Sequence, residues 1–168
     1  PFLDGRDTPP RSFLEFFAKL ERVMSEIGNC RVGTIMGRYY GMDRSMNWDL
    51  TDTAYRCIVD AEGRRIETVQ AAVAESYEKD KTPDDVPMFD EYVVPYCIGD
   101  YAGMKDGDSV LHMNYRQDRA IQLAMAFESP DYPGSIEPRP DVVFVGLTRY
   151  YNEFESFIMG PMDEGGGM

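Results

Sequence analysis

The amino-acid sequence predicts an α/β protein, a three-layer α/β/α sandwich on a mostly parallel sheet with a helical hairpin as an excursion. Two observations carry this prediction. A helical pattern at residues 12–27 leads into an apolar strand pattern at residues 32–36, which is half of a βαβ unit. A strand pattern at residues 109–115 then leads through a charged turn into a helical pattern ending at Phe127, so the same order of elements recurs.

The first elements follow from local residue patterns. Phe2-Leu3 has the character of a strand end, and the two prolines in the turn at residues 4–10 forbid a helix there. Residues 12–27 open with the capping-box spacing Ser12-x-x-Glu15 and repeat apolar residues at helical intervals, which predicts a helix. The apolar run that follows is predicted to be a buried strand.

The middle of the chain is more irregular. Residues 49–60 are predicted to form a helix with Asp49 as its N-cap, and residues 68–79 a second helix, so that the two form the hairpin. Residues 81–107 are rich in Pro, Asp and Gly, which predicts a surface excursion with one short strand at residues 92–94.

Composition indicates one acidic globular domain. The 168 residues are 43% apolar, which suffices for one core, and 30 acidic residues against 17 basic ones give a net charge of −13. This charge argues against nucleic acid or an anionic membrane as a partner. The widely spaced Cys30, Cys57 and Cys97 are predicted to be reduced core thiols of a cytoplasmic protein. No apolar run reaches the ~20 residues of a transmembrane helix.

The last strand is predicted at residues 142–147. Residues 1–160 are predicted to form one domain. Residues 161–168 lose all periodicity and contain three consecutive glycines, so they are predicted to be a linker or a cut end.

The basic residues are mostly arginine, with 13 arginines and 4 lysines, which is unusual for an acidic protein. Five arginines follow three of the predicted strands: Arg6, Arg38, Arg44, Arg116 and Arg119. Because the ends of parallel strands converge at the ligand-binding edge of a sheet, these guanidinium groups are predicted to meet there. Together they match a phosphate plus a carboxylate, with Arg116 and Arg119 sharing one face at a helix start. Asp7 could accept a hydroxyl proton at this site.

Plainer interpretations of the same residues remain open. Arg38 and Arg44 could belong to a solvated turn and pair with Asp43 and Asp49, since surface ion pairs are common. Arg119 could pair with Asp118 or another acidic neighbour. Asp7 could equally be a turn or capping residue.

Three segments resemble, in order and spacing, motifs of the cofactor-independent (2,3-bisphosphoglycerate-independent) phosphoglycerate mutases. They are FLDGRDTPP at residues 2–10, GRYYGMDR with a following Trp-Asp at residues 37–49, and NYRQDRA at residues 114–120. The resemblance covers nearly the whole chain, but only as the substrate-binding domain that this family inserts into an alkaline-phosphatase-like domain. The family's phosphorylatable serine and two-manganese ligands belong to that other domain, and no residue here matches them.

The resemblance implies a role for each arginine loop. Arg38 and Arg44 would bind the carboxylate side of glycerate, and Arg116 with Arg119 the phosphate. Arg6 and Asp7 would address the hydroxyls, with Asp7 as the catalytic acid or base. The domain outside this chain, a partner in cis, would carry phosphoryl transfer, so this fragment is predicted to be inactive alone. A related phosphomutase acting on another small molecule, and a non-enzymatic anion-binding module, are the alternatives.

Overall fold

The structure, a computed structural model, describes residues 1–159, and its first sheet has four strands in the order β1-β2-β4-β3. Their bounds are β1 Phe2–Leu3, β2 Thr34–Gly37, β3 Arg64–Ile66 and β4 Tyr96–Ile98. β1 pairs parallel to β2, with Phe2 opposite Met36, and β3 pairs parallel to β4, whereas β2 and β4 are antiparallel. The ends of β1 and β2 therefore lie side by side, as predicted.

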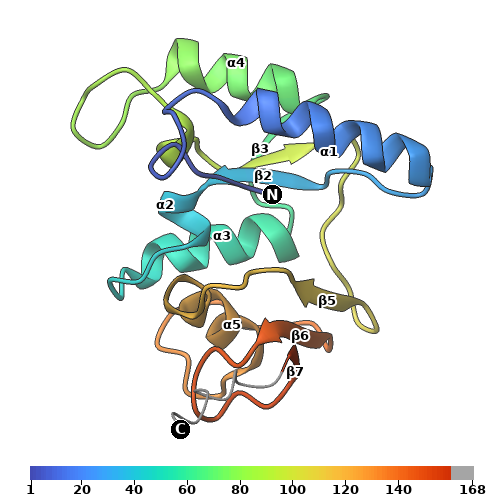
Figure 1. The fold of residues 1–168 in the computed structure, drawn as a ribbon. Helices are drawn as coiled ribbons and strands as arrows, with labels where there is room; N and C mark the ends of the chain where they lie inside the picture. Colours follow the sequence, from blue (N-terminus) through green and yellow to red (C-terminus); the bar gives the residue numbers. More distant parts are fainter. Residues whose placement is uncertain (160–168) are drawn as a thin grey trace, which may run out of the picture.

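Helices cover both faces of this sheet (Figure 1). α1 (Phe13–Ile27) and α4 (Val69–Lys79) lie on one face, and α2 (Arg38–Gly41) and α3 (Trp48–Val59) on the other. Adjacent residues of β2 show this alternation, since buried Ile35 packs in one cluster with Val73 of α4, and Met36 in another with Cys57 of α3. The predicted hairpin of α3 and α4 is therefore wrong, because the short strand β3 inserts between them and separates them across the sheet.

The remaining strands form a second sheet in the order β5-β6-β7, with every pair parallel. Its elements are β5 Ser109–His112, α5 Ile121–Glu128, β6 Val143–Thr148 and β7 Phe157–Met159. Aromatic rings connect this second sheet to the helices of the first. The ring centroids of Tyr55 in α3 and Phe127 in α5 lie 4.9 Å apart, and those of Phe127 and Phe144 in β6 lie 5.0 Å apart. The α/β class with parallel sheets is confirmed, but the strands are divided over two sheets where one was expected.

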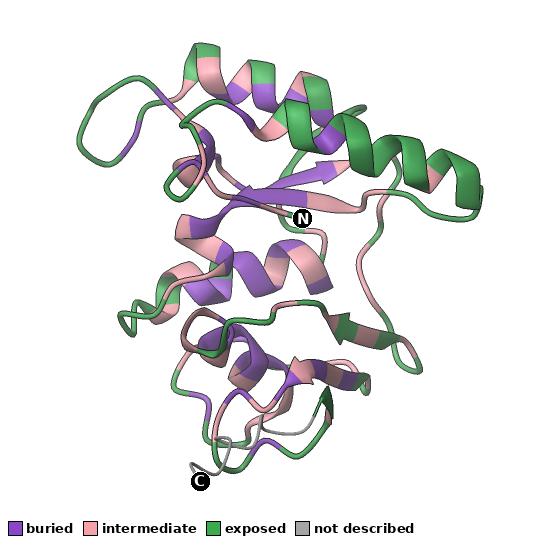
Figure 2. Cartoon of the chain, viewed as in Figure 1, coloured by how far each residue is buried: buried purple, intermediate pink, exposed green. Residues whose placement is uncertain are grey.

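Helix α1 begins one residue later than predicted, at Phe13, and has a different cap. The Ser12 side chain makes no capping bond, and the buried carboxylate of Asp90 accepts hydrogen bonds from the backbone N–H groups of Ser12 and Phe13 instead. Much of α1 is exposed (Figure 2), and of its apolar face only Phe17 is buried.

Three smaller predictions are wrong. The strand predicted at residues 92–94 does not form there: residues 90–92 form a 3₁₀ turn, and the strand that follows is β4. Asp49 was predicted to be the N-cap of α3, but it lies in the first turn of this helix and the N-cap is Asn47. Cys30 is exposed, although Cys57 and Cys97 are buried free thiols with their sulfur atoms 3.8 Å apart. The predicted linker at residues 161–168 lies outside the described residues.

Candidate functional site

The candidate site begins where β1 and β2 end, against the 3₁₀ turn at residues 90–92. Gly5 has φ of +62°, and a Cβ added there would lie 2.8 Å from the Asp90 Cβ. A Cβ added at Gly37 would lie 2.1 Å from the carbonyl oxygen of Glu91. The two glycines therefore allow both strand ends to approach one turn, and this brings the two following loops together.

Arg38 is the buried centre of the site, with only 5% of its side chain exposed. As the first residue of α2, it points its guanidinium back to the loop after β1 and donates hydrogen bonds to Asp4 and Asp7, the latter at 2.8 Å. The bond and charge of Arg38 hold the pKa of the Asp7 carboxyl below its usual range. Asp7 is thereby kept ionised, as an acceptor.

Arg6 leans toward the same 3₁₀ turn. Its guanidinium lies 3.5 Å from a carboxylate oxygen of Glu91, which is mostly buried, while the Arg6 side chain is more than half exposed. Neither Glu91 nor Asp4 was singled out in the sequence, because a partner more than thirty residues away leaves no local signal. The steric demand at Gly5 and Gly37 becomes visible only in the fold.

Arg44 and Arg116 are joined by one carboxylate. Asp118 accepts from the Arg44 guanidinium at 2.5 Å through one oxygen and from the Arg116 Nε at 2.7 Å through the other. The alternatives in which Arg44 pairs with Asp43 and Arg119 pairs with Asp118 are therefore not what the structure contains. Asp43 instead accepts backbone N–H groups within its own loop.

Arg119 lies close to the loop that carries Arg44. Its guanidinium donates to the carbonyl oxygen of Met42 at 3.0 Å, and its Nε is buried without a hydrogen-bond partner. Burial lowers the pKa of the Arg119 guanidinium, and the positive charge of Arg38 lowers it further. Arg44 and Arg6 add to this effect, so the structure brings the predicted arginines together at one edge.

This edge has the chemistry of a candidate anion site. Its guanidinium groups belong to the residue type that binds carboxylate and phosphate in a bidentate manner. Asp7 stands among them as an ionised acceptor for a hydroxyl group. Within residues 1–159, no group of three or more His, Cys, Asp or Glu side chains could hold a metal ion, and no helix is long and apolar enough to cross a membrane.

His112 is not a member of this site. Its ring lies in β5 between Phe144 and Tyr150, with ring centroids 5.8 Å and 5.3 Å away, and neither nitrogen has a hydrogen-bond partner. Burial lowers the pKa of His112 to about 4, so the ring is neutral near pH 7.

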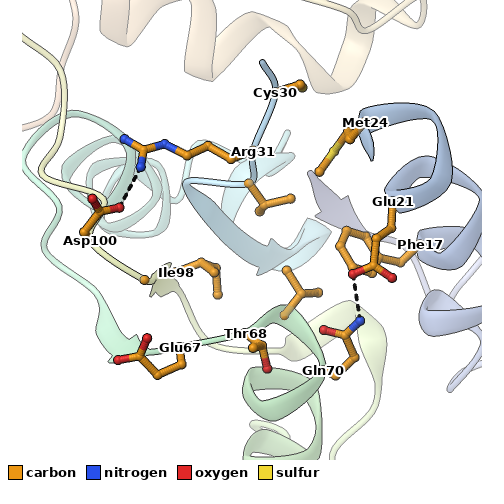
Figure 3. Close-up of a pocket in the computed structure, with 13 residues that line it drawn as sticks. Phe17, Glu21, Met24, Cys30, Arg31, Glu67, Thr68, Gln70, Ile98 and Asp100 are labelled. Carbon is orange, nitrogen blue, oxygen red and sulfur yellow. Dashed lines mark hydrogen bonds and ion pairs between the residues drawn. The ribbon is translucent and has the colours of Figure 1, made fainter. Parts of the chain in front are cut away.

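A groove of about 340 Å³ lies at the other end of β2, between α1 and the start of α4 (Figure 3). Its floor is apolar, with Phe17, Val69 and Ile98, and its rim carries the ion pair of Arg31 with Asp100. None of the five arginines of the candidate site lines this groove.

Residues 1–152 match a family model described as "BPG-independent PGAM N-terminus". The chain belongs to this family. All five arginines and Asp7 lie within the matched range, so the candidate site lies inside the part of the chain that this family shares.

Curated relatives of this BPG-independent PGAM N-terminus domain are longer proteins. The 2,3-bisphosphoglycerate-independent phosphoglycerate mutase of Laribacter hongkongensis is 40% identical over 157 residues, which are 92% of this chain and 30% of that protein. The mutase of the same description from Haloarcula marismortui is 38% identical over 166 residues, or 97% of this chain and 31% of that protein. The chain thus spans about 30% of the length of these relatives.

A solved structure supports the same assignment. A crystal structure of Leishmania mexicana phosphoglycerate mutase at low cobalt concentration superposes with a TM-score of 0.79 and 28% identity, covering 89% of this chain and 28% of that one. The similarity in fold therefore extends over most of the chain.

Proposed function

We propose that this chain is the glycerate- and phosphoglycerate-binding domain of a glycolytic phosphoglycerate mutase, an isomerase that interconverts 3-phosphoglycerate and 2-phosphoglycerate. The convergence of five arginines and one ionised aspartate at the ends of β1, β2 and the segment after β5 carries the proposal. A phosphoglycerate offers a dianionic phosphate, a carboxylate and a hydroxyl, which together need about this set of donors and acceptors.

The contacts of these side chains support the following proposed roles. Arg44, Arg116 and Arg119 approach one another through Asp118 and Met42 and would hold the two anionic groups, the phosphate on Arg116 and Arg119. Arg38 is hydrogen-bonded to Asp4 and Asp7, so its main contribution to the carboxylate side would be to hold the Asp7 carboxylate in place. Asp7 would then act as a base toward a substrate hydroxyl, with Arg6 beside it.

Phosphoryl transfer would belong to a phosphatase-like domain outside this chain, its partner in cis, which would carry the phosphoserine and two manganese ions. The described residues do not fit such a metal pair, since they contain no suitable cluster of ligands. We therefore expect the purified chain to show no mutase or phosphatase turnover with or without added manganese, in a coupled assay. Metal-dependent turnover would contradict this division of labour.

Calorimetric titration at low salt tests the binding role. The chain should bind 3-phosphoglycerate with sub-millimolar to millimolar affinity, because each solvent-exposed ionic contact contributes only about 1 kcal/mol. The double variant Arg116→Ala/Arg119→Ala should weaken 3-phosphoglycerate more than glycerate. The matched control is Arg31→Ala at the opposite end of β2, which should leave both affinities unchanged. Equal losses for the two ligands would place the phosphate elsewhere, and no preference over sulfate would favour a plain anion-binding module.

A further inference from the structure

The loop that carries Arg44 joins α2 to α3 and has an uncommon backbone. We call residues 42–47 the Arg44 loop. Met46 has φ of +60°, a left-handed conformation in which a residue other than glycine is uncommon. Met46 is 70% exposed and about half of the Arg44 side chain faces solvent, so packing of their side chains contributes little to holding the loop in place.

Part of the support is internal. Asp43 accepts hydrogen bonds from the backbone N–H groups of Ser45 at 3.1 Å and Asn47 at 2.9 Å. A second bond, from the Asn47 side chain at 3.2 Å, occupies the other oxygen of the same carboxylate. These bonds shape the turn but do not attach it to the rest of the site.

The attachment comes from Gln122 on α5, which is only 5% exposed. Its amide nitrogen donates to Asp43 at 3.0 Å and to the Thr51 hydroxyl at 2.9 Å. Its amide oxygen accepts from the backbone N–H of Met46 at 2.8 Å, the residue with the left-handed backbone. Every hydrogen-bonding direction of this buried amide that the structure records therefore goes to the Arg44 loop or to the helix that follows it.

Gln122 lies close in sequence to two of the site arginines. It lies three residues after Arg119, on the helix that begins where the Arg116 to Arg119 segment ends. Two further bonds join the same two segments: Arg119 donates to Met42, and Arg44 donates to Asp118 at 2.5 Å. Gln122 therefore connects the loop of Arg44 to the element that presents the other two arginines.

We propose that Gln122 is a positioning residue of the substrate site, which sets Arg44 at its distance from Arg116 and Arg119 by holding the Arg44 loop against α5. This inference rests on the proposed function. It implies that Gln122 affects only ligands that use Arg44. A ligand held by Arg116 and Arg119 alone should not depend on it.

The direct test is Gln122→Met, which keeps the length of the side chain and removes all three hydrogen bonds. Affinities for glycerate, 3-phosphoglycerate and inorganic phosphate are measured by calorimetry at low salt, well below the unfolding temperature. We expect the first two to fall by about tenfold and phosphate to change by less than about twofold. The matched control is Gln70→Met, which removes an exposed glutamine bond to Glu21 beside the far groove.

A second variant separates positioning from general stability. Gln122→Glu keeps an acceptor for the Met46 N–H but places a carboxylate against Asp43. Glycerate affinity of this variant should be low at about pH 8 and recover toward about pH 5.5, where the introduced carboxyl regains a proton and can donate to Asp43. The unsubstituted chain should show no such recovery.

Two direct readouts report the loop itself. Hydrogen exchange at the Met46 amide should accelerate in Gln122→Met, because that N–H loses its acceptor. Trp48, the single tryptophan, follows the loop and packs 5.4 Å from Tyr132, so its fluorescence should become more accessible to acrylamide.

The outcomes are separable. If the unsubstituted chain binds no 3-phosphoglycerate, the proposed function fails and this inference fails with it. If it binds, and Gln122→Met weakens phosphate as much as glycerate or weakens neither, the positioning role alone is overturned.

Discussion

The charged side chains at the two ends of strand β2 differ in how far they are buried and how they are paired. The far end opens into the groove between α1 and α4, whose ion pair of Arg31 with Asp100 is 72% and 85% exposed. At the other end the Arg38 guanidinium is 5% exposed and held by two carboxylates. The groove has volume and an apolar floor, but its charges are solvated and each could be lost at little cost.

The two ends of β2 therefore differ in how their charged side chains are buried and paired, and this difference supports the proposed site. Burying a guanidinium costs free energy unless it is well paired, and bringing several arginines together adds repulsion. Both features occur at the edge where we propose that the anion binds. The following predictions test whether the two ends differ in this way, starting with the largest effect.

The strongest contrast should come from alanine at two glycines. Gly37→Ala should destabilise the fold by roughly 3 kcal/mol or more, because the added Cβ would overlap the backbone carbonyl of Glu91, and this backbone cannot move aside without disturbing the 3₁₀ turn. Gly28→Ala, at the end of α1, meets nothing within 4 Å and should cost only about 1 kcal/mol for its positive φ. Urea unfolding of both variants measures this. Equal losses would mean that the 3₁₀ turn does not buttress the arginine end.

Removing the buried guanidinium should have the next largest effect. Arg38→Met should lower the free energy of unfolding by about 2 kcal/mol, which is less than the cost of breaking a fully buried pair, because Asp7 is largely exposed. Arg31→Met should change it by less than about 0.5 kcal/mol, since both partners of that pair are exposed. Thermal and urea unfolding at low salt compare the two. A loss for Arg31→Met as large as that for Arg38→Met would remove the distinction between the ends.

Acid should weaken the fold through His112. Its pKa in the folded chain, about 4, lies below the ordinary 6.5, so the unfolded chain binds the proton more tightly. Stability linked to this ring is therefore complete above pH 6.5 and falls as the pH drops toward 4, by at most about 1.4 kcal/mol per pH unit. His112→Phe should flatten that part of the profile of unfolding free energy against pH. An unchanged slope would show that the ring is solvated or finds a partner.

The smallest expected effect is on ligand binding at low pH. Because Arg38 keeps the pKa of Asp7 below its usual range, the affinity for 3-phosphoglycerate should not vary with Asp7 protonation between about pH 5 and pH 8. Asp7→Asn should lose less than about threefold in affinity, since its role is proposed in chemistry and not in anion binding. Calorimetry across that range checks both statements. A larger loss would make Asp7 a binding residue.

Much of the chain followed from local sequence. The helical repeat at residues 12–27 predicted α1 to within one residue, and the strand patterns located β1, β2, β5 and β6. The three arginine-bearing segments were also readable, because each lies directly after an apolar strand. Periodicity and turn chemistry act between near neighbours, so they leave their mark in the sequence itself.

The tertiary structure alone decided how these pieces face one another. Asp90 caps α1 from 77 residues away, Asp118 reaches Arg44 across 74, and Gln122 reaches Asp43 across 79. The separation of α3 from α4 and the division of the strands into two sheets also depend on long-range packing. Which charge meets which depends on how whole helices and strands pack, and no local pattern encodes a partner so far along the chain. The sequence by itself therefore determined the arginines and their order, whereas long-range packing decided which carboxylates and amides hold them in place.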